Sequence, residues 1–416
     1  MMNILSYRET WANISPRRVL EFPRLLSTVP STPLPLPPRA CALALAGFLV
    51  LLQPQPAKAE TTVSYKYQDY REAGGRIGVQ VNSALIETTL GTAARLRFTG
   101  VIDTIAGATP TGQEVATPDG AVPLAQMEEE RMAWTADYSH QFSRVNVTLG
   151  LANSRESDYV SDGASLNAVV DFNEKNTGLF VGLSATDDTL RVFHQTDWAG
   201  KRSVDALLGM TQLFGPHTKA GLNLGWGRST GYLNDPYKII TKRTELLPGI
   251  FLPLTFRENR PAERKKRNVF ASLNHALPAA RGAIDASYRL YDDSFGITSH
   301  TLAVAWFQKL GAQIIVIPSF RFYRQTAADF YRVSLTGTTI TPSNLPQPGG
   351  PFYSADYRLA ACRSLTPGLK VVWNPTDRLR LELAGERYTM KGRDGVTSAS
   401  AFPRADIVTA GVLYAW

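Results

Sequence analysis

The sequence has few cysteines, few charged residues and no long apolar run beyond residue 59. It contains two cysteines, Cys41 and Cys362, and the first lies in a segment that is predicted below to be removed. No intramolecular disulfide is then possible, and we expect Cys362 to be a small buried or lumen-facing residue. Beyond residue 59, no apolar run approaches the about 20 residues of a membrane-spanning helix. Charged residues make up 19% of the chain, below the roughly 25% usual in soluble domains.

A strong positive charge is also missing from the predicted mature chain. The whole sequence has a formal net charge of +8, but residues 1–59 contain six Lys or Arg and two Asp or Glu. The remainder has 38 Lys or Arg against 34 Asp or Glu, a net charge of +4. A protein that binds nucleic acid through its phosphates needs a much stronger basic surface. We therefore expect no nucleic-acid partner.

The first 59 residues have the character of a leader followed by a secretion signal. Residues 1–38 are unpatterned and contain Pro and Arg, which indicates an unstructured leader or an overlong start. In residues 39–59, Arg39 precedes the apolar run 40–52, and Ala57-Lys-Ala59 fits the small-x-small cleavage rule. The run is too short to span a bilayer, which favours a signal over an anchor. Cleavage after Ala59 would release residues 60–416 for the bacterial outer membrane.

The mature chain is dominated by two-residue alternation. Val145, Val147, Leu149 and Leu151 take every second position, opposite polar or small residues. The last residues repeat the pattern and end on Trp416. This period is that of a β-strand with two different faces. An outer-membrane barrel typically ends on such a strand, which the barrel-insertion machinery recognises; a soluble β-sandwich would also alternate, so the links must decide.

The links between the alternating segments differ in length in a regular way. Short links are predicted at residues 90–93, 140–144, 173–176, 214–218, 277–282, 309–313 and 374–377. Longer links are predicted between them, at residues 103–131, 154–165, 184–203, 228–267, 292–299, 325–358 and 392–402, with residues 71–75 as a short exception. This alternation is typical of short periplasmic turns and long extracellular loops. It predicts an all-β, transmembrane, antiparallel up-and-down barrel of sixteen strands, or of fourteen if residues 76–90 and 353–365 are delimited differently.

Charged residues on the face opposite the apolar stripe are candidates for the barrel lumen. Lys or Arg costs about 2–4 kcal/mol on the lipid face at mid-depth, so we expect these side chains to point inward. Mixed charges could pair and seal the interior, or a basic surplus could favour anions. A barrel of sixteen strands is wide enough for an aqueous channel unless loops fill it. The candidates are Arg95, Arg97, Lys219, Arg289, Arg321, Arg380 and Glu382, together with Lys66, Asp285 and Glu386.

Asp residues next to aromatic residues recur at the predicted extracellular rim. One interpretation is structural, because aromatic residues form interfacial girdles and Asp caps turns. The alternative is a ring of carboxylates that binds Ca²⁺ or attracts a cationic solute. No other cofactor is indicated. The candidates are Asp158, Tyr159, Asp235, Tyr237, Asp293, Asp329, Tyr331 and Asp356.

The predicted loop 228–267 is rich in Lys and Arg and encloses the apolar stretch 246–254. A solvated surface loop is the plainest interpretation of its charge. It could also contact the phosphates of outer-membrane lipopolysaccharide or recruit an anionic ligand. The apolar stretch favours packing against another part of the protein, so the loop could fold inward as a constriction.

Several loop sequences resemble an uncharacterised bacterial outer-membrane barrel family known as domain of unknown function 3570. They include Glu156-Ser-Asp-Tyr159, Gly231-Tyr-Leu-Asn-Asp-Pro-Tyr-Lys238, Tyr291-Asp-Asp-Ser-Phe-Gly296, Tyr323-Arg-Gln-Thr-Ala-Ala-Asp-Phe-Tyr331 and Tyr353-Ser-Ala-Asp-Tyr-Arg358. The resemblance spans nearly the whole mature chain and implies an outer-membrane location. It also implies a possible periplasmic redox partner, and it supplies no catalytic residue.

Catalytic motifs are not apparent in the sequence. The five histidines lack metal-ligand spacing, and Ser272 and His275, three residues apart, fall on opposite faces of a strand. We therefore expect no enzyme. The leading hypothesis is a porin-like channel or substrate-binding translocation component with a basic-leaning lumen, surrounded by outer-membrane lipid. The alternative is a non-conducting structural or docking barrel that supports a periplasmic redox partner.

Overall fold

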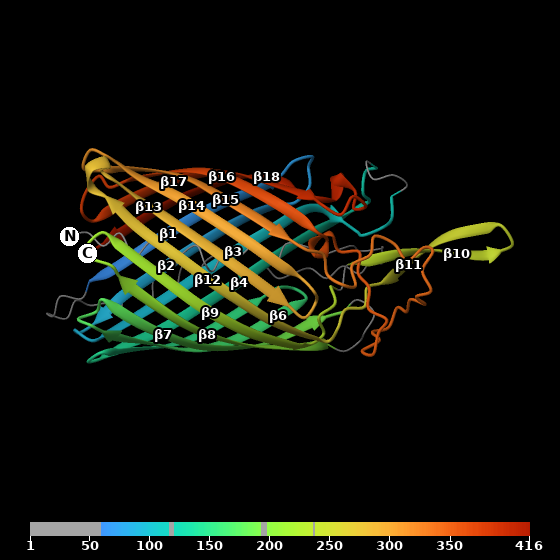
Figure 1. The fold of residues 1–416 in the computed structure, drawn as a ribbon, viewed down its shortest axis with the longest axis horizontal. Helices are drawn as coiled ribbons and strands as arrows, with labels where there is room; N and C mark the ends of the chain where they lie inside the picture. The colour runs from blue at the N-terminus through green and yellow to red at the C-terminus, as the bar shows by residue number, and fades with distance from the viewer. Residues whose placement is uncertain (1–59, 116–119, 193–197, 236–237) are drawn as a thin grey trace, which may run out of the picture.

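In a computed structural model of the protein, residues 60–115, 120–192, 198–235 and 238–416 are described. The predicted leader, signal and cleavage site lie outside these residues. Sixteen antiparallel strands form one closed barrel, and two further strands, β10 (Ile239–Leu247) and β11 (Ile250–Arg257), pair in a separate sheet (Figure 1). No helix in the described part is long and apolar enough to cross a membrane.

The strands of the barrel follow one another around the wall in chain order. They are β1 (Thr61–Glu72), β2 (Gly78–Leu90), β3 (Ala94–Pro110), β4 (Leu124–Phe142), β5 (Val145–Arg155), β6 (Tyr159–Phe172), β7 (Thr177–Arg191), β8 (Trp198–Leu213), β9 (Thr218–Gly231), β12 (Glu263–Leu277), β13 (Gly282–Asp293), β14 (Thr298–Leu310), β15 (Ile314–Gln325), β16 (Cys362–Trp373), β17 (Leu379–Gly392) and β18 (Arg404–Ala415).

Closure joins the first strand to the last. The β1–β18 ladder runs from the Thr62–Ala415 pair to the Glu72–Ala405 pair. β9 pairs directly with β12, so the β10–β11 hairpin projects beyond the wall and adds no strand to it (Figure 1). The prediction of sixteen strands is therefore confirmed, and the fourteen-strand alternative is wrong.

The links confirm the predicted asymmetry between the two barrel ends, but several of the long links are shorter than expected. Residues 156–158 replace the predicted link 154–165, and residues 294–297 replace 292–299. β3 continues as far as Pro110, and β4 begins already at Leu124. The link between them is therefore shorter than predicted, because the hydrogen-bonded ladder extends further than the alternation indicated. The two longest connections are residues 232–262, which contain the hairpin, and residues 326–361.

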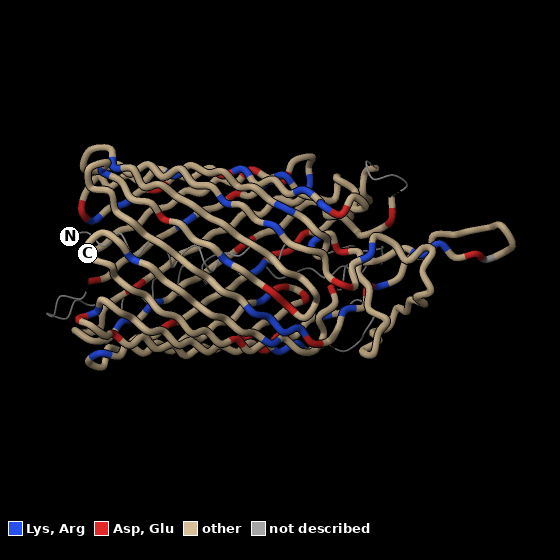
Figure 2. The backbone as a smooth tube through the Cα atoms, in the orientation of Figure 1, with Lys and Arg blue, Asp and Glu red and all other residues tan. Residues whose placement is uncertain are grey.

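The barrel has an apolar outer face and a polar inner face. Large apolar side chains such as Leu149, Leu183 and Leu383 are more than half exposed, as expected for residues that contact lipid. Their strand neighbours on the opposite face include many Ser, Thr, Asn and Gly residues. Figure 2 shows that charged residues are more frequent over the half of the barrel next to the long loops.

A charge on the outer face should be much more costly than the same charge on the inner face. We expect Leu151→Arg on β5 to reduce the free energy of unfolding by about 2–4 kcal/mol, because the side chain faces the bilayer. Thr135→Arg, on the inner face of β4 at almost the same depth, is the matched control. Denaturant unfolding in phospholipid vesicles measures both, and equal losses would contradict the assigned faces.

Candidate functional site

The strand registers place all the predicted lumen residues on the inner face. Each has the parity opposite to that of the exposed apolar residues on its strand. The seven primary candidates are Arg95, Arg97, Lys219, Arg289, Arg321, Arg380 and Glu382, and Lys66, Asp285 and Glu386 share their face.

Two acidic residues bind three of the seven inward-facing basic candidates. Glu87 on β2 contacts Arg97 at 2.6 Å and Arg95 at 3.2 Å. Glu382 on β17 accepts a hydrogen bond from Lys370 at 2.8 Å and lies 3.8 Å from Lys66. Glu87 and Lys370 were not among the sequence-predicted candidates, although their alternation would have placed them inward.

Three further candidates make polar or aromatic contacts with residues of neighbouring strands or turns. The Arg289 guanidinium lies 5.5 Å from the centre of the Phe270 ring. Nε of Arg380 donates to Oδ1 of Asn374 at 3.1 Å. Asp285 accepts a hydrogen bond from Asn274, which is the Cα partner of Lys219. Several charged side chains of the inner wall therefore have partners on adjacent strands or turns.

The inner face is close to charge balance. Within the barrel strands, thirteen Lys or Arg and twelve Asp or Glu have inward parity. The predicted basic-leaning lumen is wrong for the described strands, because the candidates left out inward acids such as Asp103, Asp137 and Asp188. Asp103 binds Arg131 at 2.5 Å, and Asp188 binds Lys201 at 2.8 Å.

Loops at the extracellular end pack against one another, and we call them the cap. The cap consists of residues 111–115 and 120–123, 232–235, 238 and 258–262, 294–297, 326–361 and 393–403, with the base of the β10–β11 hairpin at Ile240, while the rest of the hairpin projects beyond it. Buried aromatic residues hold these loops together: the rings of Phe295 and Phe330 meet edge to face at 5.0 Å, as do those of Tyr357 and Phe402 at 5.9 Å. A second cluster joins Ile240 of β10 to Leu335 and Tyr353. The cap therefore has an apolar core of its own.

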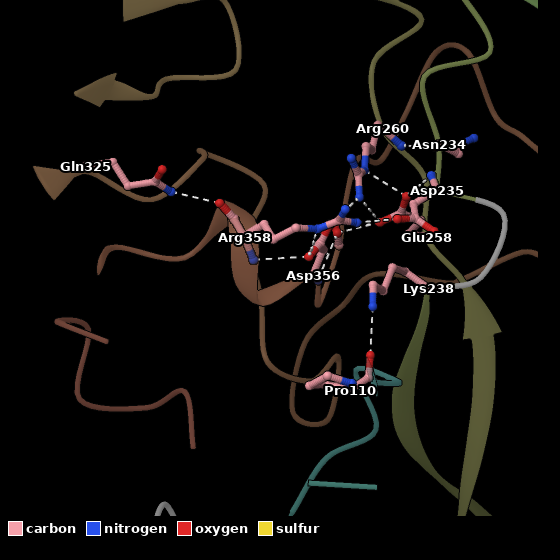
Figure 3. Close-up of polar contacts among 10 residues, drawn as sticks. Pro110, Asn234, Asp235, Lys238, Glu258, Arg260, Gln325, Asp356 and Arg358 are labelled. Carbon is pink, nitrogen blue, oxygen red and sulfur yellow. Dashed lines mark hydrogen bonds and ion pairs between the residues drawn. The ribbon is translucent and has the colours of Figure 1, made fainter. Parts of the chain in front are cut away.

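A buried cluster of charged residues joins two of the cap loops (Figure 3). We call Asp235, Glu258, Arg260, Asp356 and Arg358 the arginine–carboxylate cluster. Asp356 is 1% exposed and receives Arg260 at 2.9 Å and Arg358 at 2.6 Å. Arg358 also binds Asp235, and Arg260 contacts Glu258 at 2.7 Å. Each arginine thus bridges two carboxylates, and the cluster links residues 235–260 to residues 356–358.

Neighbouring polar groups complete the cluster. The hydroxyl of Ser354 donates to Glu258 at 2.5 Å, and the backbone N–H of Arg260 donates to Asn234 at 2.6 Å. Gln325, at the end of β15, donates to the carbonyl of Arg358 at 2.8 Å and so ties the cluster to the barrel wall. Fully buried Lys238 donates to the carbonyl of Pro110 at 2.7 Å, which connects the β3–β4 loop.

The surroundings shift the pKa values of the two central carboxyls in opposite directions. Burial raises the pKa of Glu258 to about 7, against the lowering effect of Arg260 and with further raising by Asp235 and Asp356. Burial also disfavours the charge of Asp356, but Arg358 and Arg260 outweigh it and hold the pKa of Asp356 below its usual range. Glu258 is consequently the member of the cluster that titrates near neutral pH.

The rim candidates do not form one ring of carboxylates. Asp235 and Asp356 meet in the arginine–carboxylate cluster, but Asp293 binds Arg264 and the Tyr291 hydroxyl instead. Asp329 is exposed elsewhere in the cap. Among the described residues, no group of three or more His, Cys, Asp or Glu could hold a metal ion. Arginines therefore take the place that the Ca²⁺ hypothesis assigned to a cation.

The remaining rim candidates have separate environments. Burial, together with the nearby charge of Glu129, raises the pKa of Asp158 to about 6. Tyr159 receives a hydrogen bond from Lys201 at 3.4 Å, and Tyr331 is buried with its hydroxyl 2.6 Å from that of Thr397. Tyr237 lies outside the described residues.

The basic loop does not fold inward. Its apolar stretch forms the far end of the β10–β11 hairpin, where Leu247, Ile250 and Phe251 are more than half exposed (Figure 1). The part that packs is the base of the hairpin, at Ile240, and the residues after β11, at Glu258 and Asn259. The predicted constriction is therefore wrong, because an isolated two-stranded hairpin leaves both of its faces uncovered beyond the cap.

The residues of the cluster that sequence reasoning missed are Glu258, Arg260 and Arg358. All three were visible as charges in predicted loops, but nothing local marked them as buried. The signal available was the pairing of Asp with Arg in Asp356-Tyr-Arg358 and of Glu with Arg in Glu258-Asn-Arg260, each at a spacing of two. Ser272 and His275 lie on opposite faces of β12, as predicted.

The chain matches the family described as "Protein of unknown function (DUF3570)" over residues 39–201 and 191–402. The chain belongs to this family. No protein of curated function matches it in sequence.

Solved structures show a distant likeness in fold. A ferric enterobactin receptor mutant from Pseudomonas aeruginosa shares 11% identity, with a TM-score of 0.42 over 86% of this chain and 60% of the receptor. The siderophore receptor PirA from Pseudomonas aeruginosa shares 10% identity, with a TM-score of 0.44 over 86% of this chain and 62% of PirA. A bacterial polysaccharide outer membrane secretin shares 10% identity, with a TM-score of 0.44 over 86% of this chain and 98% of the secretin. The chain thus spans about 60% of the length of the receptors.

Removing Arg358 should loosen the cap without unfolding the barrel. We expect Arg358→Ala to destabilise the closed cap by about 3–5 kcal/mol, because it leaves Asp235 and Asp356 buried with fewer partners. Hydrogen exchange of the amides of residues 356–360 measures this loss. Arg387→Ala is the control, since its pair with Asp406 is exposed, and it should leave cap exchange unchanged. Slow exchange in Arg358→Ala would contradict the role of the cluster.

The closed cap should become less stable as the pH rises. The pKa of Glu258 is raised in the closed cap, so the stabilisation from its bound proton is fully present below its usual pKa and is lost as the pH rises through about 7. We expect cap exchange, corrected for intrinsic rates, to accelerate between pH 5 and pH 8, values chosen to bracket that pKa. Glu258→Gln cannot titrate and should flatten this dependence. Parallel profiles for the two proteins would refute the assignment.

Proposed function

We propose that this outer-membrane barrel is a gated translocation pathway for a polar solute, closed on the extracellular side by the cap. The observation that carries the proposal is a polar, charge-balanced inner face beneath a cap that is joined by a buried arginine–carboxylate cluster. A barrel of this strand number is wide enough for a water-filled passage.

The composition of the inner wall favours a barrel through which solutes pass over a sealed barrel with a structural role. A barrel that served only as a scaffold could fill its interior with apolar side chains, whereas this one presents Ser, Thr, Asn and paired charges along its strands. The near balance of basic and acidic residues provides no strong field of one sign. We therefore expect little preference between small anions and cations.

The cap supports gating because its central contacts are ionic. Replacing a buried ion pair by apolar residues is often neutral or stabilising, so a buried charged cluster is weak evidence for stability. Its strength depends on every partner being in place, which suits a closure that opens as a unit. The cluster joins loops of separate strand pairs, so breaking it removes the ionic part of the contact between residues 232–262 and residues 326–361.

Planar-bilayer recording tests the proposal. The wild-type barrel should conduct rarely, and Arg358→Gln should increase the fraction of time spent open by more than about tenfold, because the closed state loses buried pairs. A barrel in which a short turn replaces residues 326–361 should stay open. Arg387→Gln should behave like the wild type, since its ion pair is exposed.

The absence of conductance is the result that would contradict the proposal. If the barrel without residues 326–361 inserts, keeps its β content by circular dichroism and still does not conduct, the translocation proposal is wrong. A non-conducting docking barrel, with a periplasmic partner, would then be the function to pursue.

A further inference from the structure

Basic side chains lie side by side on the outer face of the barrel near its extracellular end. Arg324 of β15 is the Cα partner of Arg363 of β16, and Arg363 is the Cα partner of Lys391 of β17. His300 of β14 continues the line as the Cα partner of Arg324. Directly opposed residues on adjacent strands hold their Cβ atoms about 4.5–5.5 Å apart. We call Arg324, Arg363 and Lys391, with His300 beside them, the basic row.

The basic row lies at the upper edge of the apolar band. Its residues are exposed and share strand parity with outward-facing Phe320 and Leu365. Two residues towards the short turns, about 7 Å along each strand, the same face carries Leu302, Phe322 and Leu365. On the other side, the strands lead into the cap loops. The row therefore lies at the level of lipid headgroups in the outer leaflet.

The charges of the row are not neutralised by the protein. The side chains of Arg324, Arg363 and Lys391 make no hydrogen bond or ion pair with any residue in the described part of the chain. Two other exposed cations near this end have partners: Arg387 binds Asp406 at 2.9 Å, and Arg71 binds Asp69 at 2.6 Å.

Like charges that are directly opposed on neighbouring strands destabilise a sheet. A ligand with negative charge would relieve the repulsion among these three adjacent cations. Guanidinium groups bind phosphate through paired N–H donors, and a cationic line above an apolar surface fits a molecule with phosphates above acyl chains.

We propose that the basic row binds the phosphates of a phosphorylated outer-leaflet lipid, the lipid A part of lipopolysaccharide, whose acyl chains pack against Leu302, Phe322 and Leu365. This site is separate from the lumen and from the arginine–carboxylate cluster. It is also distinct from the β10–β11 hairpin, which projects beyond the cap (Figure 1).

The test uses the complete mature barrel in detergent, with bound lipid counted by native mass spectrometry. Lipid A with two phosphates should bind the wild type, and the variant Arg324→Gln/Arg363→Gln/Lys391→Gln should bind it about a hundredfold more weakly, since each cation near a charged lipid contributes about fivefold. The control Arg71→Gln/Arg387→Gln removes two exposed but paired cations and should keep wild-type binding. Circular dichroism confirms that each variant is folded.

Two further ligands separate the sources of phosphate. Lipid A stripped of its phosphates should bind the wild type no better than the triple variant binds intact lipid A. Inorganic phosphate at the same concentration should not displace lipid A. Equal binding of intact lipid A to the wild type and to the triple variant, or displacement by inorganic phosphate alone, would overturn the proposal.

Discussion

The structure depends on one constraint: backbone N–H and C=O groups inside a bilayer must find partners within the protein. The β1–β18 ladder meets this requirement by leaving no free edge. The direct pairing of β9 with β12 meets it locally, because it carries the wall past the insertion that contains β10 and β11. The loops of the cap can then assemble on a rigid rim, to which Gln325 at the end of β15 ties the backbone of Arg358.

The cap combines two kinds of interaction with different consequences. Apolar contacts such as that between Phe295 and Phe330 lose their stabilising energy gradually as they open, since each buried atom contributes separately. The arginine–carboxylate cluster is closer to all-or-none, because removing one partner leaves buried charges uncompensated. Arg260 and Arg358 both bind Asp356, so a movement that frees either arginine weakens the hold on the other loop. This arrangement favours two discrete states of the cap over a continuous range.

The sequence was sufficient for the barrel and insufficient for the cap, for a physical reason. A strand with one face on lipid must alternate, so sixteen strands and the inward direction of Arg95 or Glu382 follow from local pattern. Strand ends are less certain, because the β3–β4 ladder continues through Gly107 and Thr109, which resemble loop residues. In the cap, Asp235 and Arg358 are 123 residues apart, and nothing in their own neighbourhoods indicates that they meet. The exposed tip at Phe251 shows the same limit, since its apolar sequence predicted burial.

The charges of the barrel differ in where their partners are. Many of those in the lumen and the cap are compensated from within the protein, as Glu87 and Asp356 show. Those of the basic row have no such compensation in the described chain, so their electrostatic energy depends on the surrounding membrane. Arg324 and Arg363 also flank residues 326–361, the connection that supplies Asp356 and Arg358 to the cap. An anion held between these two arginines would therefore add to the backbone pairing that already joins the ends of β15 and β16, up to the Gln325–Cys362 pair from which that connection starts.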